Sequence, residues 1–185
     1  MAQSEINWRI FELDDFSIVS FSDAHSFWPW RLGRECSVFN LENLNYKNLI
    51  NAIKEKNPKT FLYTIEFFPE EGKYHWDGHR NCDVVLEPKE AMKYNNICPV
   101  CRKELTIGVL HRIEELASRQ HGFVKPNAVP FKNLVPLSEL LATLLNTSVF
   151  TKRVWEEHTK LIQRFGNELN VLLEANHEDI KLISV

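Results

Sequence analysis

Four potential metal ligands in the middle of the chain constrain its fold more than any other feature. His79 and Cys82 are separated by two residues, as are Cys98 and Cys101, and fifteen residues lie between the two pairs. Tight turns with this spacing aim both side chains of a pair at one ion, and four such donors form the tetrahedral site that zinc prefers. His75 is an alternative to His79 as the fourth ligand. We therefore expect a structural zinc site, because four protein ligands leave no coordination position open for catalysis.

A redox role is the alternative interpretation of the Cys-x-x-Cys pair. The chain lacks a thioredoxin-like βαβ pattern around this pair, and the companion His-x-x-Cys favours a metal. Cys36 is the one cysteine outside the four-ligand pattern. We expect its thiol to pack as a small apolar group.

The composition is that of a folded protein with room for one ordinary domain or two small ones. Of the 185 residues, 44% are hydrophobic and 25% are charged. No run approaches the roughly 20 apolar residues of a membrane span, and the first residues do not resemble a signal peptide, so we expect a cytoplasmic protein. The net charge of -3 excludes a uniformly cationic surface, but residues 73–132 carry ten Lys/Arg against seven Asp/Glu.

The hydrophobic pattern predicts a mixed α+β fold. Alternation predicts a strand over residues 16–22, helical spacing from Asn45 to Pro58 predicts a helix, and β-branched and aromatic residues predict a strand over 60–68. A helical pattern runs from 105 to 117. Two amphipathic helices are expected over 137–145 and 154–165, the second ending at Gly166, followed by a strand-like run over 169–173.

Asp23 and His25 follow directly after the predicted strand 16–22. In an extended chain, residues i and i+2 point to the same side, so a carboxylate and an imidazole would converge beyond the end of the strand. These side chains are natural ligands for ions that activate water. A capping aspartate beside a surface histidine is the alternative, and the sequence contains no His-x-His to complete a hydrolytic centre.

Five ordered motifs resemble the C-terminal portion of endonuclease Q, over residues 7–173. The motifs are Ser22-Asp23-Ala24-His25-Ser26, Arg31-Leu32-Gly33-Arg34-Glu35, Tyr74-His75-Trp76-Asp77-Gly78-His79-Arg80-x-Cys82, Cys98-Pro99-Val100-Cys101 and Leu105-Thr106-Ile107-Gly108-Val109-Leu110-His111-Arg112. Endonuclease Q proteins carry an N-terminal PHP (polymerase and histidinol phosphatase) domain, a zinc-binding domain and a helical tail. They nick DNA on the 5′ side of deaminated bases, such as uracil and hypoxanthine, and of abasic sites.

The resemblance implies a fold in three segments. Residues 1–70 would be the remnant of a PHP-type (β/α) barrel, residues 71–121 a zinc-ribbon-like domain and residues 122–185 a C-terminal helical region. Asp23 and His25 match the last metal-ligand motif of the PHP domain, which implies a catalytic Zn, Mn or Mg ion. Because PHP domains take most of their ligands from sequence before this motif, we expect the chain to be truncated and inactive alone. The remaining ligands would lie on missing sequence or on a separate chain.

The same resemblance implies contacts with DNA. Phosphate contacts would come from basic residues beside the metal-ligand loop and near the zinc site, and an aromatic side chain would stack on a base. The residues expected to make these contacts are Arg31, Arg34, Lys73, Trp76, Arg80, His111 and Arg112. The alternative function is a zinc-ribbon module that binds nucleic acid or protein without enzymatic activity.

Overall fold

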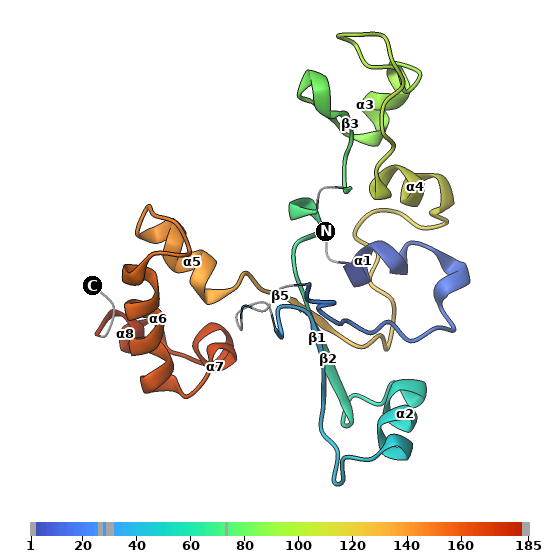
Figure 1. The fold of residues 1–185 in the computed structure, drawn as a ribbon. Coiled ribbons are helices and arrows are strands. Elements are labelled where there is room, and N and C mark those ends of the chain that lie inside the picture. Colours follow the sequence, from blue (N-terminus) through green and yellow to red (C-terminus); the bar gives the residue numbers. More distant parts are fainter. Residues whose placement is uncertain (1–2, 26–27, 29–31, 73, 183–185) are drawn as a thin grey trace. The chain divides into compact units, whose positions relative to one another are not determined.

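The computed structural model describes residues 3–25, 28, 32–72 and 74–182, which form two compact units. The first unit comprises residues 1–21 and 35–133, and the second comprises residues 22–34 and 134–185. Figure 1 labels the helices and strands of both units. In the described residues, no helix is long and apolar enough to cross a membrane.

The first unit contains a three-stranded sheet with the order β1-β2-β5. Strand β1 (Cys36–Phe39) is antiparallel to β2 (Phe61–Glu66), and β2 is parallel to β5 (Phe131–Asn133). Helix α2 (Tyr46–Glu55) connects β1 to β2, and the Asn45 side chain caps it by accepting a hydrogen bond from the Asn48 N–H. The helix predicted after Asn45 and the strand predicted over 60–68 are both confirmed.

A buried carboxylate fixes the N-terminal helix α1 (Gln3–Trp8) to this sheet. The Glu66 side chain is 1% exposed at the end of β2. Its oxygens accept hydrogen bonds from the Ser4 N–H at 2.9 Å, the Ser4 hydroxyl and the Thr64 hydroxyl. Since a buried carboxylate without donors is costly, these bonds hold α1 against β2.

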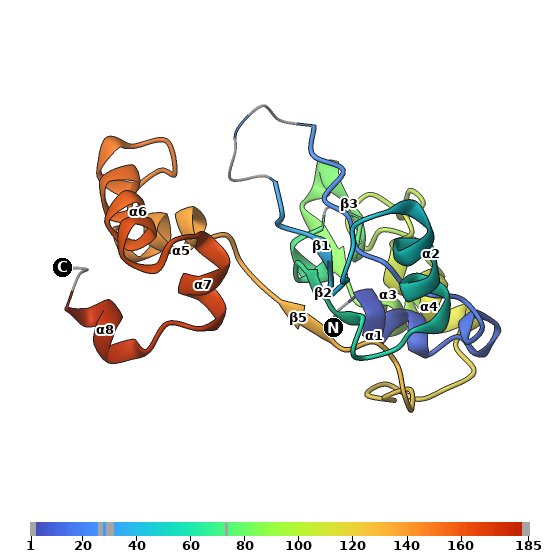
Figure 2. The same cartoon turned by 90° about the horizontal axis from the view of Figure 1, so that it is seen from below.

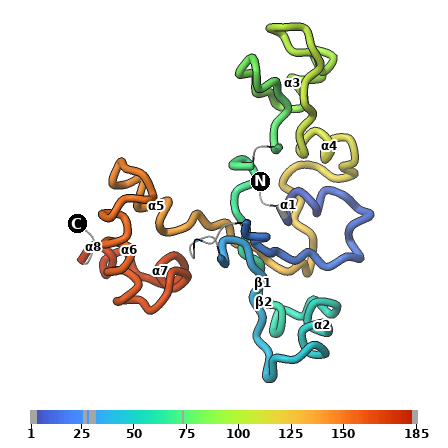
Figure 3. Tube along the Cα trace, viewed as in Figure 1, coloured from blue at the N-terminus to red at the C-terminus, as the bar shows by residue number. Residues whose placement is uncertain are grey.

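The rest of the first unit follows the sheet. It contains η1 (Phe11–Leu13), η3 (Pro69–Glu71), β3 (Asp77–His79), η4 (Arg80–Cys82), β4 (Val84–Leu86), α3 (Pro88–Lys93) and α4 (Val109–Leu116). Figure 3 traces the return of the chain after α4 past the N-terminal segment, where Ser118 and Arg119 donate to the Arg9 carbonyl and Arg119 forms an ion pair with Asp14. Ile6, Ile10 and Ile113 form a small apolar cluster there.

The second unit contains four helices packed around one apolar cluster. They are α5 (Leu137–Leu144), α6 (Lys152–Phe165), α7 (Glu168–Leu173) and α8 (His177–Lys181). Figure 2 shows α5 beside α6, and the two helices share a core that includes Leu141, Val154 and Leu161. The helices predicted over 137–145 and 154–165 are confirmed, with Gly166 at φ 89° after the second.

Three predictions of secondary structure are wrong. Residues 16–22 form no strand: Ser20 is buried and its hydroxyl donates to the Ile65 carbonyl, while Phe16 and Phe21 are exposed. The segment 169–173 is helical, because the Asn167 side chain caps α7 by accepting from the Asn170 N–H. The helix predicted from 105 begins at Val109 instead, since Thr106 pairs with Gly78.

The core of the second unit gives a direct test of this packing. Leu161 is 2% exposed between α5 and α7, so Leu161→Ala leaves a cavity and should lower the free energy of unfolding by about 2–5 kcal/mol. Leu144→Ala, at a position 80% exposed, should change it by less than about 0.5 kcal/mol. Urea unfolding followed by circular dichroism measures both. Equal effects of the two substitutions would contradict the packing.

Candidate metal centre and its surroundings

The four predicted ligands lie together in the structure. One donor atom from each of His79, Cys82, Cys98 and Cys101 lies within 4.8 Å of all the others. Among the described residues this is the one such group of three or more His, Cys, Asp or Glu donors, and His75 is not a member of it. The structure therefore selects His79 over His75 as the histidine of the cluster.

Local structure explains how the sequence brings these donors together. His79 ends β3, the short helix η4 carries Cys82, and β4 returns antiparallel to β3. The strands approach so closely that a Cβ on Gly78 would lie 2.4 Å from the Val84 carbonyl oxygen. Cys98 and Cys101 follow α3, where the Cys98 N–H donates to the Lys103 carbonyl and the Arg102 N–H donates to the Cys98 carbonyl. The fifteen residues between the pairs thus contain a strand and a helix.

The geometry of the cluster fits zinc. Nδ1 of His79 and Sγ of Cys101 are 3.5 Å apart. In a tetrahedral site with Zn–S near 2.3 Å and Zn–N near 2.0 Å, such atoms are separated by about 3.5 Å. Three thiolates and one imidazole are also a common donor set of structural zinc sites. The cluster could therefore hold a metal ion such as zinc.

The three sulfurs differ in how easily they ionise. Burial and the neighbouring sulfurs of Cys98 and Cys101 raise the pKa of the Cys82 thiol to about 11. Burial also opposes ionisation of Cys98, but hydrogen bonds from the backbone of Cys101 and Val100 lower the pKa of that thiol overall. Closely spaced thiolates repel one another, so a dication supplies the charge that lets all three ionise.

A buried acid–base pair joins the strand that carries His79 to helix α4. Asp77 is fully buried, and its carboxylate accepts hydrogen bonds from the Gly108 N–H at 2.6 Å and from His111 Nδ1 at 2.5 Å. His111, which the sequence predicts to contact DNA, is 2% exposed and bonded to Asp77 in this structure. No role for Asp77 was predicted from the sequence, although Asp77 alternates with His79 on the same strand.

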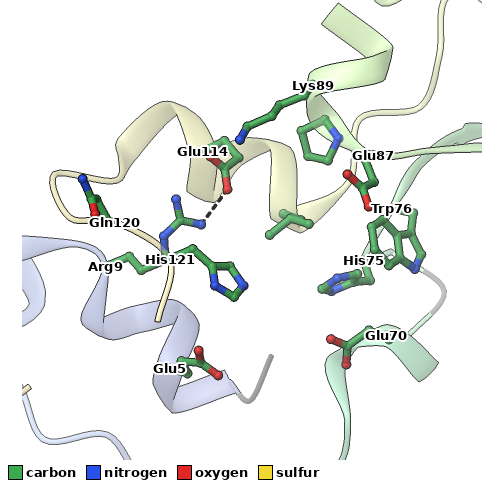
Figure 4. Close-up of a pocket in the computed structure, with 12 residues that line it drawn as sticks. Glu5, Arg9, Glu70, His75, Trp76, Glu87, Lys89, Glu114, Gln120 and His121 are labelled. Carbon is green, nitrogen blue, oxygen red and sulfur yellow. Dashed lines mark hydrogen bonds and ion pairs between the residues drawn. The ribbon is translucent and has the colours of Figure 1, made fainter. Parts of the chain in front are cut away.

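Two pockets flank Trp76 in the first unit. One, of about 660 Å³, lies along the β3–β4 hairpin and is lined by exposed Tyr74, by Ile107 and by Arg80. The other, of about 670 Å³, is drawn in Figure 4, where His75 and His121 point into the opening. It is lined by Glu5, Arg9, Glu70, His75, Trp76, Glu87, Pro88, Lys89, Leu110, Glu114, Gln120 and His121.

In the pocket drawn in Figure 4, an ion pair and burial shift the pKa values of two lining residues. Arg9 donates to Glu114 at 2.6 Å, which lowers the pKa of the Glu114 carboxyl, and burial lowers the pKa of His75. The His75 ring also packs edge-on against Trp76, with ring centroids 4.6 Å apart. His75 thus supports Trp76 instead of binding with the cysteines.

The basic residues that were predicted to contact DNA differ in their exposure and in their partners. Arg80 is exposed between His79 and Cys82, and Arg112 is exposed with an ion pair to Glu115 at 2.6 Å. Arg34 is half-buried in the second unit. Arg31 and Lys73 lie outside the described residues.

Asp23 and His25 lie in the second unit with strongly exposed side chains, 92% and 85% respectively. His25 Nδ1 donates to the Asp23 backbone carbonyl at 2.7 Å, so Nε2 is the ring nitrogen that would bind a metal. Histidines that bind metals commonly donate their other ring nitrogen in this way. Within the described part of the chain, these two residues belong to no group of three metal ligands.

Removal of one ligand tests the metal centre. Because metal binding and folding are coupled in such a site, Cys98→Ser should abolish tight zinc binding and unfold the β3–β4 hairpin. The matched substitution Cys36→Ser, at the cysteine outside the cluster, should retain about one zinc per chain. Atomic absorption after gel filtration and amide chemical shifts provide the readouts. Loss of zinc from both variants, or from neither, contradicts the assignment.

Comparison with known proteins gives similarity over nearly the whole chain. Residues 136–185 match the family model described as the MJ0043 C-terminal domain. The uncharacterized protein MJ0043 of Methanocaldococcus jannaschii is 34% identical over 98% of this chain and 23% of its own length. The uncharacterized protein YqxK of Bacillus subtilis is 25% identical over 93% of this chain and 40% of its own length.

Two solved structures match with high scores. The lesion-specific endonuclease PfuEndoQ from Pyrococcus furiosus gives a TM-score of 0.87 with 28% identity, covering 98% of this chain and 45% of the enzyme. Endonuclease Q in complex with a 27-mer duplex with an abasic lesion at the active site gives 0.84 with 28% identity, covering 98% and 46%. The chain spans less than half the length of each of these four proteins. The resemblance predicted from its motifs is confirmed: the chain has the fold of part of endonuclease Q.

Proposed function

We propose that this chain is the DNA-binding part of an endonuclease that acts at deaminated bases and abasic sites. The observation that carries the proposal is the similarity, over 98% of the chain, to a lesion-specific endonuclease and to its homologue crystallised with an abasic duplex. An identity of 28% at TM-scores of 0.84–0.87 supports a related function as well as a shared fold.

The surface along the β3–β4 hairpin would meet the DNA. Arg80 is exposed between two ligands of the metal cluster, and it lines the same pocket as Tyr74 and Trp76. Cations beside aromatic rings are the combination with which proteins hold phosphates and unstacked bases. Arg112 lies on α4 and would exchange its ion pair with Glu115 for a phosphate. Arg31, Arg34 and Lys73 remain further candidates for phosphate contacts.

The metal of the Cys₃His cluster would have a structural role in this function. It would fix the hairpin that carries Arg80, while Asp23 and His25 would supply two ligands of a separate hydrolytic centre. Their exposure and the use of Nδ1 in the bond to the Asp23 carbonyl are compatible with ligands contributed by another segment or another chain. A hydrolytic ion at such a centre would activate water and stabilise charge on the phosphate.

The alternative function is a binding module without cleavage, which is favoured by a complete Cys₃His cluster and by the absence of a second group of three metal ligands among the described residues. A nicking assay on a uracil-containing duplex separates the proposals. We expect no cleavage by this chain alone, and cleavage when the missing half of the PHP domain is added. Failure of the combined chains to cleave, with DNA binding intact, would favour the binding module.

The hairpin surface can be tested with charge-removing substitutions. Arg80→Gln together with Arg112→Gln removes two phosphate contacts, so log K against log salt should become shallower by about 2. The matched pair Lys47→Gln and Lys54→Gln on exposed positions of α2 should leave the slope unchanged. Fluorescence anisotropy with an abasic duplex between 50 and 200 mM salt provides the measurement. Equal slopes for both double variants, at normal zinc content, would exclude this surface.

A further inference from the structure

The positive charge of the helical region is concentrated on one helix. Helix α6 carries Lys152, Arg153, Lys160 and Arg164, whereas α5 and α7 carry no basic residue. With Glu156 and Glu157, α6 has four cations against two carboxylates, whereas α5 and α7 carry Glu139 and Glu168, and α8 carries Glu178 and Asp179 against Lys181. The net charge of α6 is therefore positive, although the net charge of the whole chain is -3.

Three of these cations form a stripe along the exposed side of α6. Arg153, Lys160 and Arg164 are separated by seven and four residues, so their directions differ by no more than about 40°. All three are exposed, while Val154 and Leu161, about a quarter of a turn further around the helix, are buried. With a rise of 1.5 Å per residue, the stripe extends over about 16 Å, long enough to contact more than one phosphate of a DNA strand.

The two arginines of this stripe are available to a ligand. Lys160 is paired with Glu157 at 2.6 Å, but neither Arg153 nor Arg164 forms an ion pair with any residue that the structure describes. Planar guanidinium groups bind phosphate oxygens through two parallel hydrogen bonds. The stripe therefore offers two unpaired bidentate donors.

The charges at the start of α6 are unfavourable for the isolated helix. Its first turn contains Lys152 and Arg153 and no acidic residue. The positive end of the helix dipole favours carboxylates at this position and disfavours cations. A bound phosphate would reverse this repulsion, because helix N-termini and guanidinium groups both stabilise anions.

A shallow pocket of about 510 Å³ runs beside the stripe. It is lined by Lys152, Trp155, Glu156, Thr159 and Lys160. The Trp155 Nε1–H donates to the Val149 carbonyl at 2.9 Å, which fixes the orientation of the indole. An oriented aromatic ring between two lysines adds a stacking surface for a sugar or base to the phosphate contacts.

We propose that α6 is a second nucleic-acid contact, in which Arg153, Lys160 and Arg164 bind the phosphate backbone of duplex DNA irrespective of lesions. The inference rests on the proposed function for its ligand, but it concerns a different surface from the β3–β4 hairpin. It assigns a DNA-binding role to the segment that matches the MJ0043 C-terminal domain.

The test uses the whole chain with Arg153→Gln and Arg164→Gln. Both positions are exposed and glutamine keeps helix propensity, so the fold should be retained. For an undamaged duplex, the slope of log K against log salt should fall by about 2, and affinity at 0.1 M salt should fall at least tenfold. An abasic duplex should lose affinity by the same factor. Lys47→Gln with Lys54→Gln, spaced by seven residues on α2, is the matched control.

The outcomes distinguish this inference from the proposed function. If the α6 variant binds duplex like the control while Arg80→Gln with Arg112→Gln weakens binding, the α6 contact is wrong and the proposed function stands. If the unchanged chain binds no duplex, both fail. Binding of polyglutamate that is tighter than binding of duplex, and that is lost on Arg153→Gln with Arg164→Gln, would also overturn the inference. It would assign α6 to an acidic protein partner.

Discussion

Coordination by four side chains is the constraint on which the middle of this molecule depends. Strands β3 and β4 have three residues each, and the buried apolar cluster beside them contains Ala91, Cys98 and Leu105. So little apolar surface does not offset the entropy of ordering the segment. Three of the four donors, Cys82, Cys98 and Cys101, belong to or pack against this cluster, so the metal-ligand cluster and the local core are one structure. A dication bound by the cluster would supply the folding free energy that the side chains lack.

Asp77 connects strand β3, which carries the ligand His79, to helix α4. Its carboxylate binds the start of α4 at Gly108 and the side chain of His111. A Cβ on Gly108 would lie 2.5 Å from the backbone oxygens of His75 and Trp76, so no larger residue permits this approach without displacement. The hairpin, Trp76 and α4 are thereby held as one element. This rigidity is what a surface that contacts a DNA backbone at fixed positions requires.

Sequence reasoning succeeded where local rules determine the structure. The spacing of the four ligands identified the cluster, and periodicity with caps identified α2, α5 and α6. It failed over residues 16–22, where the Ser17 and Ser20 hydroxyls donate to the carbonyls of Ile53 and Ile65, so the alternating pattern did not correspond to a strand. The Asp77–His111 pair spans 34 residues and depends on tertiary packing, which no local pattern reveals. The charge stripe of α6 became apparent only when exposure separated Arg153 and Arg164 from their buried neighbours.

We infer that a metal in a Cys₃His site organises the part of an endonuclease Q fold that this chain contains. X-ray absorption at the zinc edge of the purified full chain reports the ligands of such a metal. Three sulfur ligands at about 2.3 Å and one nitrogen at about 2.0 Å are expected. A first shell of only nitrogen and oxygen, or one with two sulfurs and two nitrogens in which His75 takes part, would contradict it.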